Sequence, residues 1–298
     1  MSLFRRIISG TKVFAARRGK YVLMFLNGFL LASLFYFFTE KQYEKKVFTS
    51  LAQYVYAQMP EGSSSAIQED SLLINSVHLI HRLGVDRLAI FGDRPVKGVK
   101  AEIIQPVGVD LMTAQGACGS HAYMLARLLQ EMNVDVRIPQ MTVDGQSAGH
   151  IIVEAKTSHG WVVLDGLSNA YFKKPDGMLA GFADVQQNWA SYQQQVSADY
   201  NMAYRYESAR YTNWDKIPVI MPLIKNVMYW TMGREETDSY SIRSLGLNKY
   251  GVFFNITLCA YLLVILFSVN VIIKQRHRRQ DSTAAIKPEE PVHASVSA

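Results

Sequence analysis

Three side chains in the middle of this 298-residue chain, Cys118, His150 and Asp165, have the types needed for nucleophilic attack on a carbonyl group. A thiol reacts as its thiolate, and the free N–H groups at a helix N-terminus lower its pKa. An imidazole beside the thiol acts as its base or as its imidazolium partner. A carboxylate then holds that imidazole in the useful tautomer and orientation. The second cysteine, Cys259, lies in an apolar terminal block, so no disulfide framework is implied.

A helix and three short strands must position these side chains. Apolar residues recur at helical spacing over residues 118–133, so Cys118 stands where this helix begins. Three β-like runs with turn residues between them follow, at 134–141, 150–155 and 161–164. If the last two strands pair antiparallel, His150 at the start of one lies beside Asp165 at the end of the other. The backbone N–H of Cys118 is then a natural oxyanion-hole donor.

The same residues carry a family resemblance over about residues 110–170. The segments are GACGSHAYMLARLLQEMNVDVRIPQM, GQSAGHIIVEA and GWVVLDGL. Their order and spacing resemble the transglutaminase-like superfamily of papain-fold Cys-His-Asp enzymes, in a bacterial membrane-anchored form. The resemblance implies an α+β fold, in which a helix bearing the cysteine packs on an antiparallel sheet. It also implies a catalytic triad of Cys118, His150 and Asp165, with Arg137 and Trp161 at matching positions.

A different register would align QGACGSH with the signature of papain itself. Cys118 would then fall on a structural cysteine and His121 on the nucleophile, which leaves no nucleophile. We therefore favour the transglutaminase-like register. His121 lies about one helical turn after Cys118, and the sequence leaves open whether it faces the site or the core.

Several other polar and aromatic residues can be interpreted either as structural or as functional. Arg137 is better interpreted as structural than as catalytic. Tyr204, Tyr206, Tyr211 and Trp214 suit core packing, or else the wall of a substrate site, and the candidates for substrate binding are Trp161, Tyr204 and Trp214. His78 and His81, or Cys118 and His121, lack a third ligand at zinc spacing. The Asp/Glu loop that binds calcium in some animal members of the family has no counterpart. We therefore predict no metal and no cofactor.

Two uncharged apolar blocks, residues 21–38 and 251–273, are each long enough to span a bilayer. A cleaved signal peptide is the alternative for the first block, which lacks a small-x-small cleavage site. Basic residues flank the outer end of each block, so both termini are expected in the cytoplasm of a bacterial inner membrane. Residues 1–20 then form a cytoplasmic basic N-terminus, residues 40–248 a periplasmic domain with its core at about 66–172, and residues 274–298 a disordered cytoplasmic tail.

The rest of the periplasmic domain gives weaker signals. Helices are predicted at 40–59 and 66–83, followed by a loop-rich stretch at 84–116. Residues 184–206 are polar and are predicted to be helical. The apolar stretch 217–232 contains two prolines and is too short to span a membrane. It is expected either to pack on the domain or to lie on the bilayer surface.

The charge of +6 at neutral pH belongs to the membrane flanks, because residues 40–250 carry 20 basic and 22 acidic side chains. The domain therefore gives no electrostatic argument for nucleic-acid binding. We expect an enzyme that acts through a Cys118 thioester on an amide of a cell-envelope peptide, protein or glycan-linked substrate, by acyl transfer or by hydrolysis. The alternative is a non-catalytic scaffold of this fold in an envelope or polysaccharide assembly. The sequence does not indicate an oligomeric state.

Overall fold

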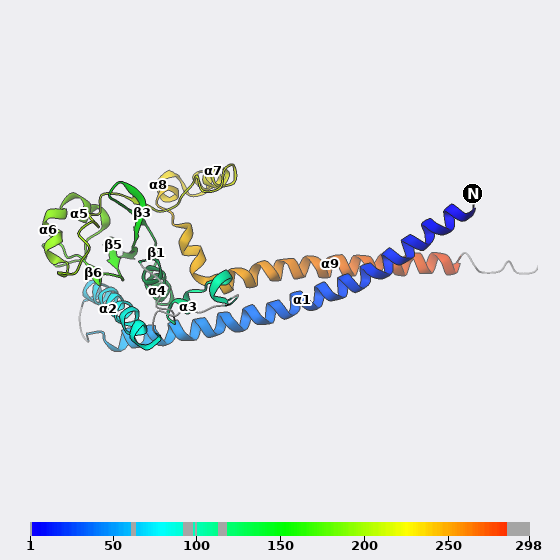
Figure 1. Cartoon of the computed structure of the whole chain (residues 1–298), viewed down its shortest axis with the longest axis horizontal. Helices are drawn as coiled ribbons and strands as arrows, with labels where there is room; N and C mark the ends of the chain where they lie inside the picture. Colours follow the sequence, from blue (N-terminus) through cyan, green and yellow to red (C-terminus); the bar gives the residue numbers. More distant parts are fainter. Residues whose placement is uncertain (1, 61–63, 92–97, 99, 113–117, 285–298) are drawn as a thin grey trace, which may run out of the picture. The chain divides into compact units, whose positions relative to one another are not determined.

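The computed structural model of the chain describes residues 2–60, 64–91, 98, 100–112 and 118–284 (Figure 1). It contains two compact units. One consists of the terminal segments up to Phe38 and from Phe253, and the other is Thr39–Val252.

The first unit is built from parts of two long helices, α1 (Ser2–Ala57) and α9 (Lys249–Ala284). Each contains a stretch that is long and apolar enough to cross a membrane, within Gly19–Ala57 and Ile242–His277. Large apolar side chains such as Phe25 and Leu263 are exposed along them, as expected for segments surrounded by lipid. α9 continues to Ala284, so residues 274–284 are helical rather than disordered. The rest of the predicted tail, 285–298, lies outside the described residues.

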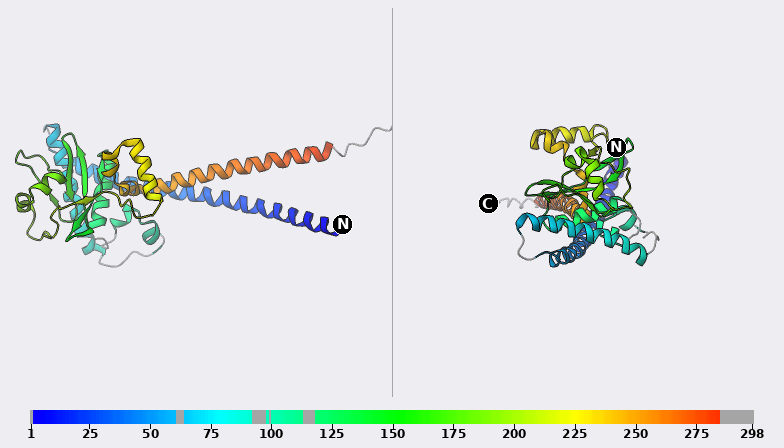
Figure 2. Two further views of the ribbon diagram at one scale, coloured as in Figure 1. Left: turned by 90° about the horizontal axis from the view of Figure 1, so that it is seen from above. Right: turned by 90° about the vertical axis from the view of Figure 1, so that its left-hand side faces the viewer.

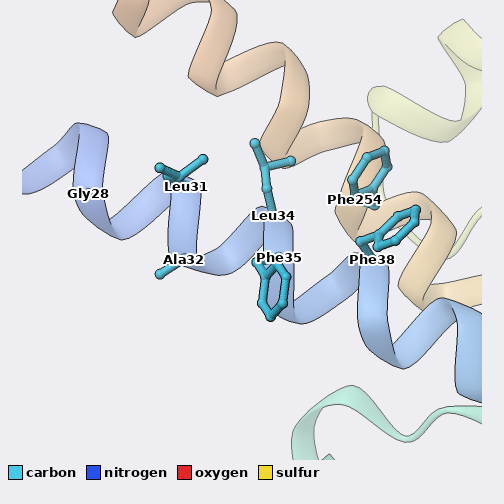
Figure 3. A pocket seen from close by; sticks show the side chains of 7 residues that line it. All are labelled: Gly28, Leu31, Ala32, Leu34, Phe35, Phe38 and Phe254. Atoms are coloured by element: carbon cyan, nitrogen blue, oxygen red, sulfur yellow. The ribbon is translucent and has the colours of Figure 1, made fainter.

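An apolar groove of about 650 Å³ lies in this first unit (Figure 3). Its lining contains only aliphatic, aromatic and glycine residues, among them Leu34, Phe38 and Phe254. None of these side chains carries a nucleophilic or titratable group.

The second unit is an α+β domain with two antiparallel sheets. The first sheet has the order β1-β4-β5-β6, and its strands are β1 (Val136–Arg137), β4 (Val153–Thr157), β5 (Gly160–Asp165) and β6 (Ala170–Tyr171). The second has the order β3-β2-β7, with β3 (Gln146–Ile151), β2 (Gln140–Val143) and β7 (Ala209–Arg210). The helices α2 (Ser65–Phe91) and α4 (Cys118–Glu131) pack on each other and contact the first sheet (Figure 1).

A seam divides the two sheets, and the sequence did not predict it. The run expected at 134–141 is split at Ile138-Pro139 into β1 and β2, and the run expected at 150–155 is split at Ile152 between β3 and β4. Pro139 has no N–H, so the ladder cannot continue through it, and a single bond from Ile152 N to Pro139 O, 3.2 Å long, crosses this point. His150 and Asp165 therefore lie on strands of different sheets, not on paired strands.

α4 is the central helix of the domain core. Its buried side chains, including Leu125, Leu128 and Leu129, pack with residues of α1, α2 and the first sheet. Burial of each such side chain contributes about 1.5–3 kcal/mol. A second cluster, rich in aromatic side chains such as Phe172 and Tyr206, joins residues of both sheets, among them Met141 and Val163, to the segments that follow β6. The helix that bears Cys118 is thus held from several sides.

Three segments differ from the sequence prediction. α2 runs on to Phe91, and a π-helical turn, η1 (Lys100–Ile104), and α3 (Val107–Asp110) occupy part of the stretch predicted as loop. Where 184–206 was predicted to be helical, there are three short pieces, namely α5 (Phe182–Gln187), α6 (Trp189–Tyr192) and η2 (Gln193–Gln195). Residues 196–206 contain no helix.

The apolar stretch near residue 220 forms α7 (Ile220–Met232), which is followed by α8 (Arg234–Asp238) and a 3₁₀ segment, η3 (Ile242–Asn248). α7 contacts α8, and both are drawn in yellow at the margin of the domain (Figure 2). No residue of α7 is buried, and Trp230 is 89% exposed. Packing into the domain core therefore does not account for its apolar side chains.

Candidate active site

Cys118 is half-buried at the first residue of α4. The backbone N–H groups of Ile151 and Gly119 hydrogen-bond to its sulfur. Burial raises the pKa of the Cys118 thiol, but its interaction with the imidazole of His150, the charge on that imidazole and the two N–H groups outweigh burial and lower the pKa below its usual value. Cys118 therefore has the environment of a reactive thiol rather than of an inert core residue.

His150 is fully buried near the end of β3 and is oriented by Asp165. Its Nε2 lies 2.8 Å from Oδ2 of Asp165. The other carboxylate oxygen, Oδ1, accepts hydrogen bonds from the backbone N–H groups of Leu167 (3.0 Å) and Ser168 (3.2 Å). The turn that follows β5 thus fixes the carboxylate, and the carboxylate fixes the imidazole. Nε2 is taken by Asp165, whereas Nδ1 is buried and forms no hydrogen bond with the described residues, so Nδ1 is the nitrogen available to the thiol.

The protonation of His150 follows from these contacts. Burial lowers the pKa of His150, but the hydrogen bond to Asp165, the interaction with Cys118 and the charges of both groups outweigh burial and raise the pKa to about 9. The lowered pKa of Cys118 and the raised pKa of His150 both favour the thiolate and imidazolium form of the pair over the neutral form. This charge state makes a cysteine nucleophilic and provides a proton for a leaving group.

Tyr204 covers one face of the His150 ring. The two rings are stacked, with 3.9 Å between their centroids. The hydroxyl of Tyr200 donates a hydrogen bond to the main-chain oxygen of Tyr204 at 3.2 Å. Tyr204 also lines a polar pocket of about 330 Å³ together with Leu167 and Ser168, the residues that bind Asp165. Within the described part of the chain, Tyr204 is the one of the three predicted substrate-binding candidates that contacts the triad.

Trp161 and Arg137 belong to a stack on the first sheet. The guanidinium of Arg137 lies 4.2 Å from the centroid of the Trp161 ring and 4.6 Å from that of Tyr211. Its Nε donates to Oε2 of the buried Glu154 at 2.7 Å. These contacts occupy both residues, so the geometry favours the structural interpretation of Arg137 and gives Trp161 the same role.

Trp214 and Tyr206 lie in different surroundings from Tyr204. Trp214 lines a pocket with Arg210 and Lys225, whereas Tyr206 is fully buried in the aromatic cluster. The tyrosines and the tryptophan that are near each other in sequence thus serve separate sites, and they do not form a single substrate wall.

His121 faces the core. It is 6% exposed, and a Cβ placed on Gly84 of α2 would lie 1.9 Å from its Nε2. Gly84 therefore permits α2 to approach α4 one turn after Cys118. The question that the sequence left open is answered by this packing, which places the imidazole against α2.

Sequence reasoning missed a polar network beneath the start of α4. Nη1 of the buried Arg87 donates to the main-chain oxygen of Asp110 and to Oγ of Ser120, the latter at 3.2 Å. Burial raises the pKa of Asp110 to about 6, against the opposing effects of Ser120 and Arg87. The network was missed because Arg87 and Asp110 lie in the stretch predicted as loop.

Among the residues that the structure describes, no three His, Cys, Asp or Glu side chains are grouped as metal ligands would be. Comparison of the chain with family models, with curated proteins and with solved structures finds no match. The functional argument therefore rests on the residues and on their geometry.

Proposed function

We propose that this protein is a membrane-anchored cysteine enzyme of the transglutaminase-like, papain-fold type, which cleaves or transfers an amide through a Cys118 thioester. The observation that carries the proposal is the buried His150, which Asp165 holds through Nε2 and whose Nδ1 is left without a partner among the described residues, in electrostatic interaction with Cys118. A buried histidine with a pKa raised to about 9, beside a thiol with a lowered pKa, is an arrangement typical of a functional site.

The chemistry uses the residues in fixed roles. The thiolate of Cys118 attacks the carbonyl carbon and forms a C–S bond, and the carbonyl π electrons move to oxygen. When the tetrahedral intermediate collapses, the C–N bond breaks, and the imidazolium of His150 gives its proton to the departing nitrogen. Water or an amine then attacks the thioester and gives its proton to His150, and the C–S bond breaks to restore the thiolate. Asp165 orients the imidazole throughout.

The location of the substrate follows from the anchor. Two candidate spans with basic outer flanks support an arrangement in which both termini are cytoplasmic and the domain is periplasmic. The exposed apolar side chains of α7 fit the same setting, at the surface of a bilayer. The substrate is then an amide of a cell-envelope peptide, protein or glycan-linked amino acid.

The test measures the alkylation of Cys118 by iodoacetamide as a function of pH in detergent-solubilised protein. Cys259→Ser serves as the background, because it leaves Cys118 as the single thiol. Labelling should be fast well below the usual thiol pKa of about 8.5, and His150→Ala should remove this reactivity. Addition of cell-wall peptides to the unlabelled protein should then produce a mass increase on Cys118 that hydroxylamine removes, as a thioester requires.

An ordinary thiol profile that His150→Ala leaves unchanged would contradict the proposal. The scaffold interpretation would then be favoured. The two functions also differ in the cell, because a scaffold with Cys118→Ala should behave like the unaltered protein, whereas an enzyme with that substitution should behave like the deletion.

A further inference from the structure

Two arginine side chains share one amide oxygen on the second sheet. Nη2 of Arg210 in β7 lies 3.4 Å from Oε1 of Gln140 in β2, and Nη2 of Arg243 in η3 lies 2.6 Å from the same oxygen. Arg243 also donates from Nη1 to the main-chain oxygen of Tyr211 at 2.9 Å. Both arginines and Gln140 are half-buried, so they are held by the protein and remain accessible at its surface.

The register of the sheet places this pair on the side of Cys118. Gln140 is the direct partner of Ile151 in β3 and of Arg210 in β7, so the three side chains point to one face. Ile151 reaches the start of α4, because its Cδ1 lies 3.6 Å from a Cβ placed on Gly119. Its backbone N–H binds the sulfur of Cys118. Since strands lie about 4.8 Å apart, β7 lies about 10 Å from β3.

Tyr123 connects the arginines to the nucleophile from the other side. It stands on α4, its Cε2 lies 4.0 Å from the same Cβ position on Gly119, and its hydroxyl interacts with Arg243 and with the charge of Cys118. Arg243 is therefore near the thiol both across the sheet and along the helix.

The positive charge of the pair is not neutralised within the described part of the chain. Neither Arg210 nor Arg243 forms an ion pair with a described carboxylate, and the two guanidinium groups repel each other. Nε of Arg210 is buried without a partner among the described residues. Two adjacent cations cost free energy unless an anion joins them.

Arg210 borders an open pocket of about 380 Å³. The pocket also contains Lys225, but that ammonium group is paired with Asp238 at 3.0 Å. Of these cations, Arg210 is thus the one that a ligand could engage without displacing an ion pair.

We propose that Arg210 and Arg243 bind a carboxylate group of the substrate whose amide Cys118 attacks. This inference rests on the proposed function and names its substrate class, an acidic peptide. Planar guanidinium groups match a carboxylate with two parallel hydrogen bonds, and Gln140 and the main chain hold them in place before the ligand arrives.

The test compares two alkylating reagents at low ionic strength in the Cys259→Ser background. Iodoacetate carries a carboxylate, whereas iodoacetamide is its neutral counterpart. The ratio of their rates at Cys118 should fall roughly three- to fourfold in Arg210→Gln and about tenfold in Arg210→Gln/Arg243→Gln, because the single variant removes one positive charge and the double variant removes two. Arg243→Lys keeps the charge and should keep most of the ratio. Arg205→Gln is the matched control, since Arg205 is an exposed arginine that forms no ion pair with a described carboxylate.

The outcomes separate the two proposals. Slow iodoacetamide labelling with an ordinary thiol profile would overturn the proposed function. The carboxylate site alone would be overturned by a different result. Iodoacetamide labelling would then be fast, but the ratio of the iodoacetate rate to the iodoacetamide rate would fall no further in Arg210→Gln than in Arg205→Gln. If the double variant does not fold, as judged by its unfolding temperature, Arg210→Gln decides the test, because the side chain of Arg210 contacts Gln140 alone among the hydrogen bonds of the described residues.

A second arm identifies the anion. Glutarate and inorganic phosphate are compared as protectants of Cys118 against iodoacetamide, each with the unaltered protein and with Arg210→Gln. Protection by glutarate that is lost in the variant supports the proposal. Protection by phosphate alone would contradict the assignment to a carboxylate.

Discussion

The ring of Tyr204 lies nearly parallel to the imidazole of His150, with 3.9 Å between the ring centroids and 11° between the planes. The face of an aromatic ring attracts a cation by about 0.5–2 kcal/mol. The stack therefore favours the charged imidazolium and covers one of its faces.

Replacement of Tyr204 tests this role. We expect Tyr204→Ala to slow the alkylation of Cys118 at mildly acidic pH by roughly threefold to tenfold, because the imidazolium loses its stacking partner. Tyr204→Phe keeps the ring and should stay close to the unaltered protein. An equal loss in both variants would show that the hydroxyl group, not the stack, is important.

The carboxylate of Asp165 sets the pH range of the site. Asp165 raises the pKa of His150, so in Asp165→Asn that pKa should fall from about 9 toward its usual 6.5. Because the imidazolium is then populated less at a given pH, it stabilises the thiolate less, and the pKa of Cys118 should rise. We expect the onset of fast labelling to move to higher pH, as measured by iodoacetamide rates against pH. Asp144→Asn, in the exposed turn between β2 and β3, is the control.

The same linkage affects stability. Because the pKa of His150 is higher in the folded protein, its interaction with Asp165 stabilises the fold fully below about pH 6.5, and the contribution is lost as the pH rises through about 9. Asp165→Asn should therefore lower the unfolding temperature more at pH 6 than at pH 10, approximately the two ends of that range. An equal decrease at both values would contradict the assigned pKa.

Gly84 should not tolerate a larger residue. Gly84→Ala would place a methyl group 1.9 Å from Nε2 of His121, so α2 and α4 must separate or the buried imidazole must move. Such overpacking costs about 1–3 kcal/mol, which exceeds the gain of about 1 kcal/mol from the better helix propensity of alanine over most of that range. We expect a lower unfolding temperature and slower labelling of Cys118.

The control for Gly84 is Gly246, because a Cβ placed there has no neighbour within 4 Å. Gly246→Ala should leave both measurements unchanged. If Gly84→Ala were as stable as the unaltered protein, the close contact between α2 and α4 would be wrong.

Arg137 should affect stability rather than reactivity. Arg137→Lys keeps a charge for Glu154 but loses the planar stack between Trp161 and Tyr211, at a cost of about 1–2 kcal/mol. Arg137→Met leaves Glu154 buried without its partner, at a cost of about 3–5 kcal/mol. The labelling rate of Cys118 in the folded protein should be unchanged in both. A change in that rate without a change in unfolding temperature would assign Arg137 to the reaction instead.

Local pattern was sufficient to predict the helix at Cys118 and the strand that ends at Asp165, because each has a clear periodicity and lies in the core. The predicted antiparallel pairing of the last two runs is confirmed, because Val153 in β4 pairs with Leu164 in β5, but His150 lies before the break at Ile152 and belongs to β3. Pro139 was the available signal for the break, because a proline cannot continue a ladder.

The remaining errors concern tertiary effects. α2 extends past Gly84 because its later turns pack on α4 and carry Arg87 into a buried network, and no local signal of residues 84–91 shows this. Arg210 and Gln140 became neighbours only through the strand β7, which has two residues and is too short to be recognised from sequence. Short strands depend on partners far away in the chain.

The seam between the sheets gives the site a mechanical property. His150 belongs to one sheet and Asp165 to the other, and their 2.8 Å hydrogen bond spans the division. A hydrogen bond weakens steeply once its atoms separate by a further ångström. A load or a distant substitution that moves the two sheets apart would therefore lengthen this hydrogen bond, and it would change the reactivity of Cys118 before the domain unfolds.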